Sequence, residues 1–91
     1  MKTYLVSYDL RQPGRDYEAL YVALKSYGTY WHVLESVWIL RTSRSAAQIR
    51  DHLTSQMDGN DQLIVAGLDG EAAWYGFTVD GGNWLKQQLA A

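Results

Sequence analysis

The chain has 91 residues, of which 47% are apolar and 13% aromatic, with no cysteine and a formal net charge of -2. This length suits one small domain, so residues 1–91 are expected to fold as a single unit. No apolar run is long enough for a membrane span, there is no charged-then-apolar leader and disulfides are excluded, so a cytoplasmic protein without a membrane partner is expected. The acidic balance excludes a generally basic surface, and any contact with nucleic acid must therefore be local.

The N-terminal third predicts a strand, a turn and a helix. Residues 2–10, KTYLVSYDL, alternate in polarity and are rich in aromatic and β-branched types, which indicates a strand. RQPGR at 11–15 is a turn sequence. A helix is predicted over 16–27, with Asp16 as its N-cap and Gly28 as its stop. Its apolar stripe has the spacing i, i+3, i+4 and i+7 and consists of Tyr17, Leu20, Tyr21 and Leu24.

The middle of the chain predicts a hairpin, a second helix and a fourth strand. Residues 29–42 are too many for one strand and carry Glu35 and Ser36 at their centre, so two strands joined by a tight turn are expected. Residues 45–57 begin with the Ser-x-x-Gln spacing of a capping box and carry apolar residues on one side, which indicates a helix. The apolar segment 61–68 completes the series as a strand.

This order of elements predicts an α+β, ferredoxin-like βαββαβ fold with an antiparallel four-stranded sheet in the order 4-1-3-2. A C-terminal extension at about 71–91 has room for a short strand and a short helix. The first strand is then central, and its end at Asp9 shares one sheet edge with Glu35, Ser36 and Asp61. Both helices cover one sheet face, so a homodimer is expected to cover the aromatic residues of the other face.

Several short motifs resemble a known family. YLVSYDL, a strand ending in Tyr8 and Asp9, is followed by a helix and by ESVW at 35–38, an arrangement that resembles the CRISPR-associated Cas-two proteins. The resemblance is closer still to the small Cas-two-like proteins of the SinR family. In those proteins SYDL, PGRDY, a WWH-like element, ES and W recur in this order, and the similarity runs from about Met1 to Phe77.

The resemblance implies a ferredoxin-like homodimer in which the two copies of Asp9 face each other and share a divalent metal ion. Some members of the family are metal-dependent nucleases on RNA or double-stranded DNA, whereas in CRISPR adaptation the protein serves chiefly as a non-catalytic bridge that binds DNA. Asp9 is therefore the implied catalytic and metal-binding residue. The virulence-associated protein D toxins, which share the fold, add the alternative of a ribonuclease controlled by an antitoxin.

The chemistry of such a site is sound in its own terms. Two carboxylates held close across a two-fold axis repel each other, and Mg²⁺ relieves that repulsion while keeping several waters. Arg11 and Arg15 could bind phosphate near the positive end of the first helix, with Ser36 as a further substrate-binding residue on the same edge. Glu35 and Asp61 could add outer carboxylates.

The residues alone leave other interpretations open. An aspartate between a strand and a turn commonly caps backbone amides or faces solvent, and this holds for Asp9. Arg11 and Arg15 flank a Pro-Gly turn and could equally be solvated side chains. Asp16 and Glu18 also reduce the local positive charge, which departs from the arginine-rich segment common in the resembled family.

Other conspicuous side chains are expected to have structural roles. His32 and His52 have no nucleophile in view and are taken as non-catalytic. Trp31 and Trp38 could stack on bases of a single strand, but burial in dimer contacts is the preferred interpretation. Three functions therefore stay open: a Mg²⁺-dependent nuclease, a non-catalytic dimeric module that binds nucleic acid or a protein partner, and a toxin-like ribonuclease.

Overall fold

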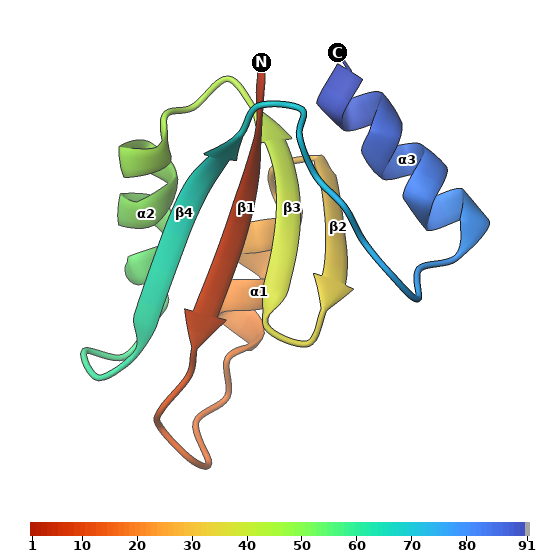
Figure 1. Cartoon of the computed structure of the whole chain (residues 1–91). Helices are drawn as coiled ribbons and strands as arrows, with labels where there is room; N and C mark the ends of the chain where they lie inside the picture. The colour runs from red at the N-terminus through yellow and green to blue at the C-terminus, as the bar shows by residue number, and fades with distance from the viewer. Residues whose placement is uncertain (91) are drawn as a thin grey trace.

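Four strands and three helices follow one another along residues 1–90, the part of the chain that the computed structural model describes. The strands form one antiparallel sheet in the order β2-β3-β1-β4 (Figure 1). This is the expected ferredoxin-like arrangement, with the predicted strand order. The elements are β1 (Lys2–Asp9), α1 (Glu18–Lys25), β2 (Thr29–Leu34), β3 (Val37–Thr42), α2 (Ala46–Thr54), β4 (Gln62–Leu68) and α3 (Val79–Ala90).

The register of β1 determines which side chains face each side of the sheet. Val6 lies opposite Trp38 of β3 and opposite Val65 of β4. Because side chains alternate along a strand, Tyr4, Val6 and Tyr8 point toward α1 and α2, whereas Asp9 belongs to the opposite set. We call the side that α1 and α2 cover the helix face and the opposite side the outer face.

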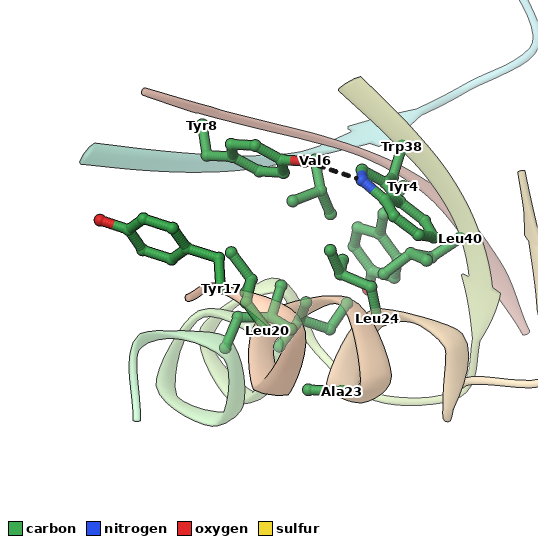
Figure 2. Close-up of a cluster of buried hydrophobic side chains, with 11 residues drawn as sticks. Tyr4, Val6, Tyr8, Tyr17, Leu20, Ala23, Leu24, Trp38 and Leu40 are labelled. Carbon is green, nitrogen blue, oxygen red and sulfur yellow. Dashed lines mark hydrogen bonds between the residues drawn. The ribbon is translucent and has the colours of Figure 1, made fainter. Parts of the chain in front are cut away.

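The hydrophobic core lies between the helix face and the two helices (Figure 2). The predicted apolar stripes of the helices form one side of this core, since Leu20 and Leu24 of α1 and Ile49 and Leu53 of α2 are fully buried. Trp38 is buried as well, and its Nε1 donates a hydrogen bond of 3.1 Å to the Tyr8 hydroxyl. These two polar groups of the core are therefore paired with each other, as most buried polar groups are.

The predicted helix ends are partly confirmed. Ser45 and Gln48 form the expected capping box of α2. Gly28 follows α1 with φ of +86°, a backbone conformation that glycine adopts without a Cβ clash. The N-cap assignment was wrong by one residue, because α1 is preceded by Tyr17 and starts at Glu18. The Asp16 carboxylate still accepts the N–H of Glu18 at 2.9 Å, so it caps the first turn of α1 from the residue before the N-cap.

The C-terminal extension differs from expectation. Residues 69–78 form no strand but cross the outer face to α3, a longer helix than the predicted short one (Figure 1). Trp31 of β2 packs edge-on against Phe77 and Trp84, with ring centroids 5.1 and 5.8 Å apart. Arg41 of β3 donates to the carbonyl of Gln88 at 2.7 Å, which ties the last turn of α3 to the sheet.

This extension changes the interpretation of the two tryptophans. Trp38 lies in the core and Trp31 lies under α3, so the chain itself covers the side chains that were expected in a dimer interface. The covered part of the outer face belongs to β2, β3 and the start of β1, where Thr3 donates to the Gln88 carbonyl of α3. Along β4 the outer face stays open, where Ile64 is 60% exposed. No helix in residues 1–90 is long and apolar enough to cross a membrane.

Two positions on α1 test this account of the core. Leu24 has no exposed surface, whereas Val22 is 57% exposed on the same helix. Leu24→Ala is expected to lower the free energy of unfolding by about 2–5 kcal/mol, because it removes buried methyl groups and leaves a cavity. Val22→Ala is expected to change it by no more than about 0.5 kcal/mol. Urea denaturation of both variants measures the difference, and equal losses would contradict the proposed packing.

Candidate functional site

Three segments meet at the sheet edge where β1 ends. Asp9 is the last residue of β1 and lies opposite Gln62, the first residue of β4. The β2–β3 turn lies on the other side, where the Ser36 carbonyl accepts the N–H of Tyr8 at 3.1 Å. The edge therefore collects Asp9, Ser36 and the start of β4, as the strand order predicted.

The Asp9 carboxylate is exposed and forms an ion pair within the chain. Its Oδ2 lies 3.0 Å from Arg11 Nε, and the two side chains are 60% and 50% exposed. Arg11 Nη2 also donates to Gln62 Oε1 at 3.0 Å, so the guanidinium bridges the ends of β1 and β4. Asp9 and Arg11, two of the predicted site residues, are thus in direct contact.

Asp61 organises the loops beneath this pair. Its Oδ1 accepts the N–H of Arg11 at 2.7 Å and the hydroxyl of Tyr17 at 2.9 Å, while Oδ2 accepts the N–H of Asp58 at 2.8 Å. Burial acts to raise the pKa of Asp61, but the two backbone donors, Tyr17 and the nearby Arg15 outweigh it and lower the pKa below its usual value. Asp61 is therefore a structural carboxylate, which holds the loop after β1 against the loop before β4.

Arg15 does not join Asp9. It pairs with Asp58 at 3.3 Å, donates to the carbonyl of Gln56 at 3.4 Å and lies over the Tyr17 ring at 5.2 Å from the centroid. Its guanidinium fixes the loop that follows α2. Of the two predicted phosphate-binding arginines, only Arg11 is at the strand end.

Two hollows flank Asp9. The outer hollow, of about 560 Å³, lies along β1 and β4 and is lined by Ser7, Tyr8, Asp9, Gln62, Leu63 and Ile64. The helix-side hollow, of about 290 Å³, lies toward the β2–β3 turn and is lined by Tyr8, Asp9, Leu10, Tyr21, Glu35 and Ser36. The predicted residues Ser36 and Glu35 therefore share the helix-side hollow with Asp9, whereas Asp61 lines neither hollow.

Within one copy of the chain, this edge offers few ligands to a divalent ion. Within residues 1–90 no three histidine, aspartate or glutamate side chains converge on one point. Asp9 offers one exposed carboxylate, a hard oxygen ligand of the kind that Mg²⁺ prefers, and Mg²⁺ is commonly held by one or two carboxylates with waters in its remaining positions. One Asp9 from each of two copies fits that donor set.

The two histidines contact aromatic side chains. His32 stacks on Trp38, with ring centroids 4.1 Å apart, and its Nε2 is hydrogen-bonded to the Glu35 carbonyl at 2.9 Å. His52 Nδ1 shares a hydrogen bond of 2.8 Å with the Tyr27 hydroxyl. Each imidazole thus has a partner that fixes its orientation.

Comparison with known proteins supports the fold. No protein-family model matches this chain. The structure is similar to the crystal structure of a hypothetical protein, TT1823, from Thermus thermophilus, with a TM-score of 0.65 and 28% sequence identity. The match covers 84% of this chain and 92% of that chain. The similarity therefore extends over most of both chains.

Sequence reasoning missed the partners that hold the site together. Gln62, the second partner of Arg11, carries no motif, but the antiparallel pairing that places it opposite Asp9 could have identified it. Tyr21 was assigned to the core stripe, yet it is half-buried and also lines the helix-side hollow. The spacing of the stripe does not show which of its members are only partly buried.

Asp61→Asn tests the role of this carboxylate in stability. The substitution is expected to lower the free energy of unfolding by about 1–3 kcal/mol at neutral pH, because it removes the charged acceptor of three hydrogen bonds. Since the native pKa of Asp61 is depressed, its contribution is present above the unfolded value of about 3.9 and is lost as pH falls through the native pKa. The difference between the two proteins should therefore narrow below about pH 4.

Asp51→Asn provides the control for this measurement. Asp51 is 70% exposed on α2 and pairs with its neighbour Arg50. Its substitution should leave the free energy of unfolding nearly unchanged at every pH. If the difference in free energy of unfolding between the wild type and Asp61→Asn stayed constant from pH 7 to pH 2, the assigned role of the ionised Asp61 carboxylate would be contradicted.

Proposed function

We propose that this protein is a Cas-two-like homodimer of the SinR type that cleaves RNA or DNA phosphodiesters, with Mg²⁺ shared by the Asp9 carboxylates of two copies. The observation that carries this proposal is the exposed Asp9 carboxylate at the end of the central strand, beside an uncovered part of the sheet. Since α3 covers the outer face over β2, β3 and the start of β1, the open surface for a second copy lies along β4 and the end of β1, next to Asp9.

The ion pair between Asp9 and Arg11 is compatible with metal binding. Both side chains are at least half exposed, and exposed ion pairs contribute only about 0–1 kcal/mol, so a divalent ion can displace the guanidinium from Asp9. The backbone of Arg11 stays fixed, because its N–H is held by Asp61. The displaced guanidinium is then available for the non-bridging oxygens of a phosphate, which it can bind through two parallel hydrogen bonds.

The remaining groups at the edge have supporting roles in this mechanism. When bound, Mg²⁺ supplies a Lewis acid for the phosphodiester and a water of lowered pKa. Gln62 keeps the Arg11 guanidinium near the strand end, since it accepts a hydrogen bond from Nη2. The Ser36 hydroxyl lies on the rim of the helix-side hollow and is the second donor for substrate.

A second candidate function is a non-catalytic dimeric module. The specific observation in its favour is that Arg11 and Arg15 are each engaged by a carboxylate, Asp9 and Asp58. With Asp61 and Glu35 included, the edge carries two positive and four negative charges, a net charge of -2. Such an edge is less favourable for polyanions and suits a protein partner better than DNA.

The Asp9→Asn variant tests whether the protein cleaves nucleic acid through a metal ion bound at Asp9. In the presence of Mg²⁺ or Mn²⁺, the wild type is expected to cut labelled RNA or DNA, and EDTA should stop the reaction. Asp9→Asn should reduce the rate by roughly 100-fold or more, because the loss of a metal ligand exceeds the effect of losing an outer-sphere partner. Size-exclusion chromatography with light scattering should show a dimer for both proteins.

Asp51→Asn is the matched control, since it removes an exposed carboxylate on α2, away from the strand end. It should cleave at the wild-type rate. Full activity of Asp9→Asn, or a monomeric wild type, would overturn the nuclease proposal.

Fluorescence anisotropy with the same oligonucleotides tests the second candidate. Binding without turnover, with an affinity that falls steeply as salt is raised, would identify a nucleic-acid-binding module. The absence of both binding and turnover would favour a protein partner.

A further inference from the structure

The helix-side hollow has an aromatic wall whose orientation is fixed by stacking. The ring of Tyr21 lies nearly parallel to Trp38 and to His32, at interplanar angles of 17° and 27° with centroids 6.4 and 6.3 Å apart. His32 and Trp38 are themselves stacked at 4.1 Å. Tyr21 is half-buried, and it borders the hollow together with Tyr8. A planar ligand therefore meets a rigid aromatic surface.

The hollow is also lined by polar groups with unused hydrogen-bonding capacity. No hydrogen bond or ion pair joins the Glu35 carboxylate or the Ser36 hydroxyl to another of residues 1–90. Their backbone is nevertheless fixed, because the Glu35 carbonyl contacts His32 Nε2 at 2.9 Å and the Ser36 carbonyl accepts the N–H of Tyr8 at 3.1 Å. These side chains are presented to a ligand from a defined turn.

Tyr8 also lines this hollow. It accepts a hydrogen bond from Trp38 Nε1, and burial, together with the nearby Tyr21 and Glu35, raises the pKa of Tyr8 above its usual value of 10.0. The hydroxyl therefore keeps its proton at neutral pH. The hollow thus combines aromatic faces, hydroxyl groups and two carboxylates, of which Asp9 is paired with Arg11 and Glu35 has no partner within residues 1–90.

We infer that the helix-side hollow binds one unpaired guanine base of the substrate, stacked on Tyr21 with its Watson–Crick edge toward Glu35. The inference rests on the proposed function, since it names the substrate class of the same strand end. A carboxylate only accepts hydrogen bonds, and guanine is the base that offers it two adjacent N–H donors, at N1 and N2. The volume of about 290 Å³ is at the lower end for small-ligand sites and suits a single base.

The position of the hollow connects this base to the proposed cleavage site. Asp9 lines both hollows, so a nucleotide whose base enters the helix-side hollow brings its phosphate to the end of β1. A base in a duplex cannot present its Watson–Crick edge, because its partner base occupies that edge. The substrate is therefore single-stranded RNA or DNA, or an unpaired loop, in which a base can be turned out and stacked on an aromatic ring.

Binding of nucleoside monophosphates tests this site without depending on cleavage. Titration of the full chain with GMP, AMP, CMP and UMP, followed by amide NMR shifts, should show GMP binding with shifts at Glu35, Ser36 and Tyr21. Glu35→Gln should weaken GMP binding by about tenfold or more, as expected for the loss of one bidentate contact to a base, and should leave the weak binding of UMP unchanged.

Matched variants separate recognition from folding. Glu71→Gln removes an exposed carboxylate from the segment between β4 and α3 and should bind GMP as the wild type does. Tyr21→Phe keeps the aromatic ring and should still bind GMP. Tyr21→Leu should no longer bind GMP, while its amide NMR spectrum should remain that of a folded protein. Equal affinity for all four nucleotides, no GMP binding at millimolar concentration, or unchanged binding by Glu35→Gln would overturn the inference.

The result separates the two proposals made for this edge. GMP binding that is lost in Glu35→Gln, in a protein that cuts no nucleic acid, would support the base site and reject the nuclease. Cleavage that depends on Asp9 but is equal for guanine-free oligonucleotides and for Glu35→Gln would reject the base site alone.

Discussion

The pairing of β1 with both β3 and β4 is the constraint on which the rest of the structure depends. It places at the centre of the sheet a strand whose side chains alternate between the two faces, so that Tyr4, Val6 and Tyr8 reach the core. The same register leaves the final carboxylate outside the core, at an edge where two loops converge. A shift by one residue would exchange the two faces, burying Asp9 and exposing Val6, so hydrophobic burial also determines the position of the site.

Most of the fold was predictable because its signals are local and repeated. The stripe that contains Leu20 and Leu24, the Ser45–Gln48 capping box and Gly28 each define an element, and the order of elements then restricts the topology. The extension was less predictable because its position depends on contacts distant in sequence. The packing of Trp31 against Trp84 joins residues more than fifty positions apart, and no periodicity reveals such a pair.

The candidate site was predictable in location but not in its pairings. The strand order was enough to bring Asp9, Ser36 and the start of β4 to one edge. The sequence did not show that Arg11 would contact Asp9 while Arg15 turned to Asp58, since both arginines flank the same Pro-Gly turn. Such choices depend on loop geometry, which here is set by the hydrogen bonds to Asp61 and by the stacking of Arg15 on Tyr17.

The anchoring of α3 also has a practical consequence. Thr3 Oγ1 and Arg41 both donate to the Gln88 carbonyl, so the two ends of the described chain lie together at the sheet edge opposite Asp9 (Figure 1). Affinity tags or fluorophores attached at either end would project away from the end of β1 at Asp9. A short linker could join the ends into a circular permutant opened elsewhere, since the existing contacts already hold them side by side.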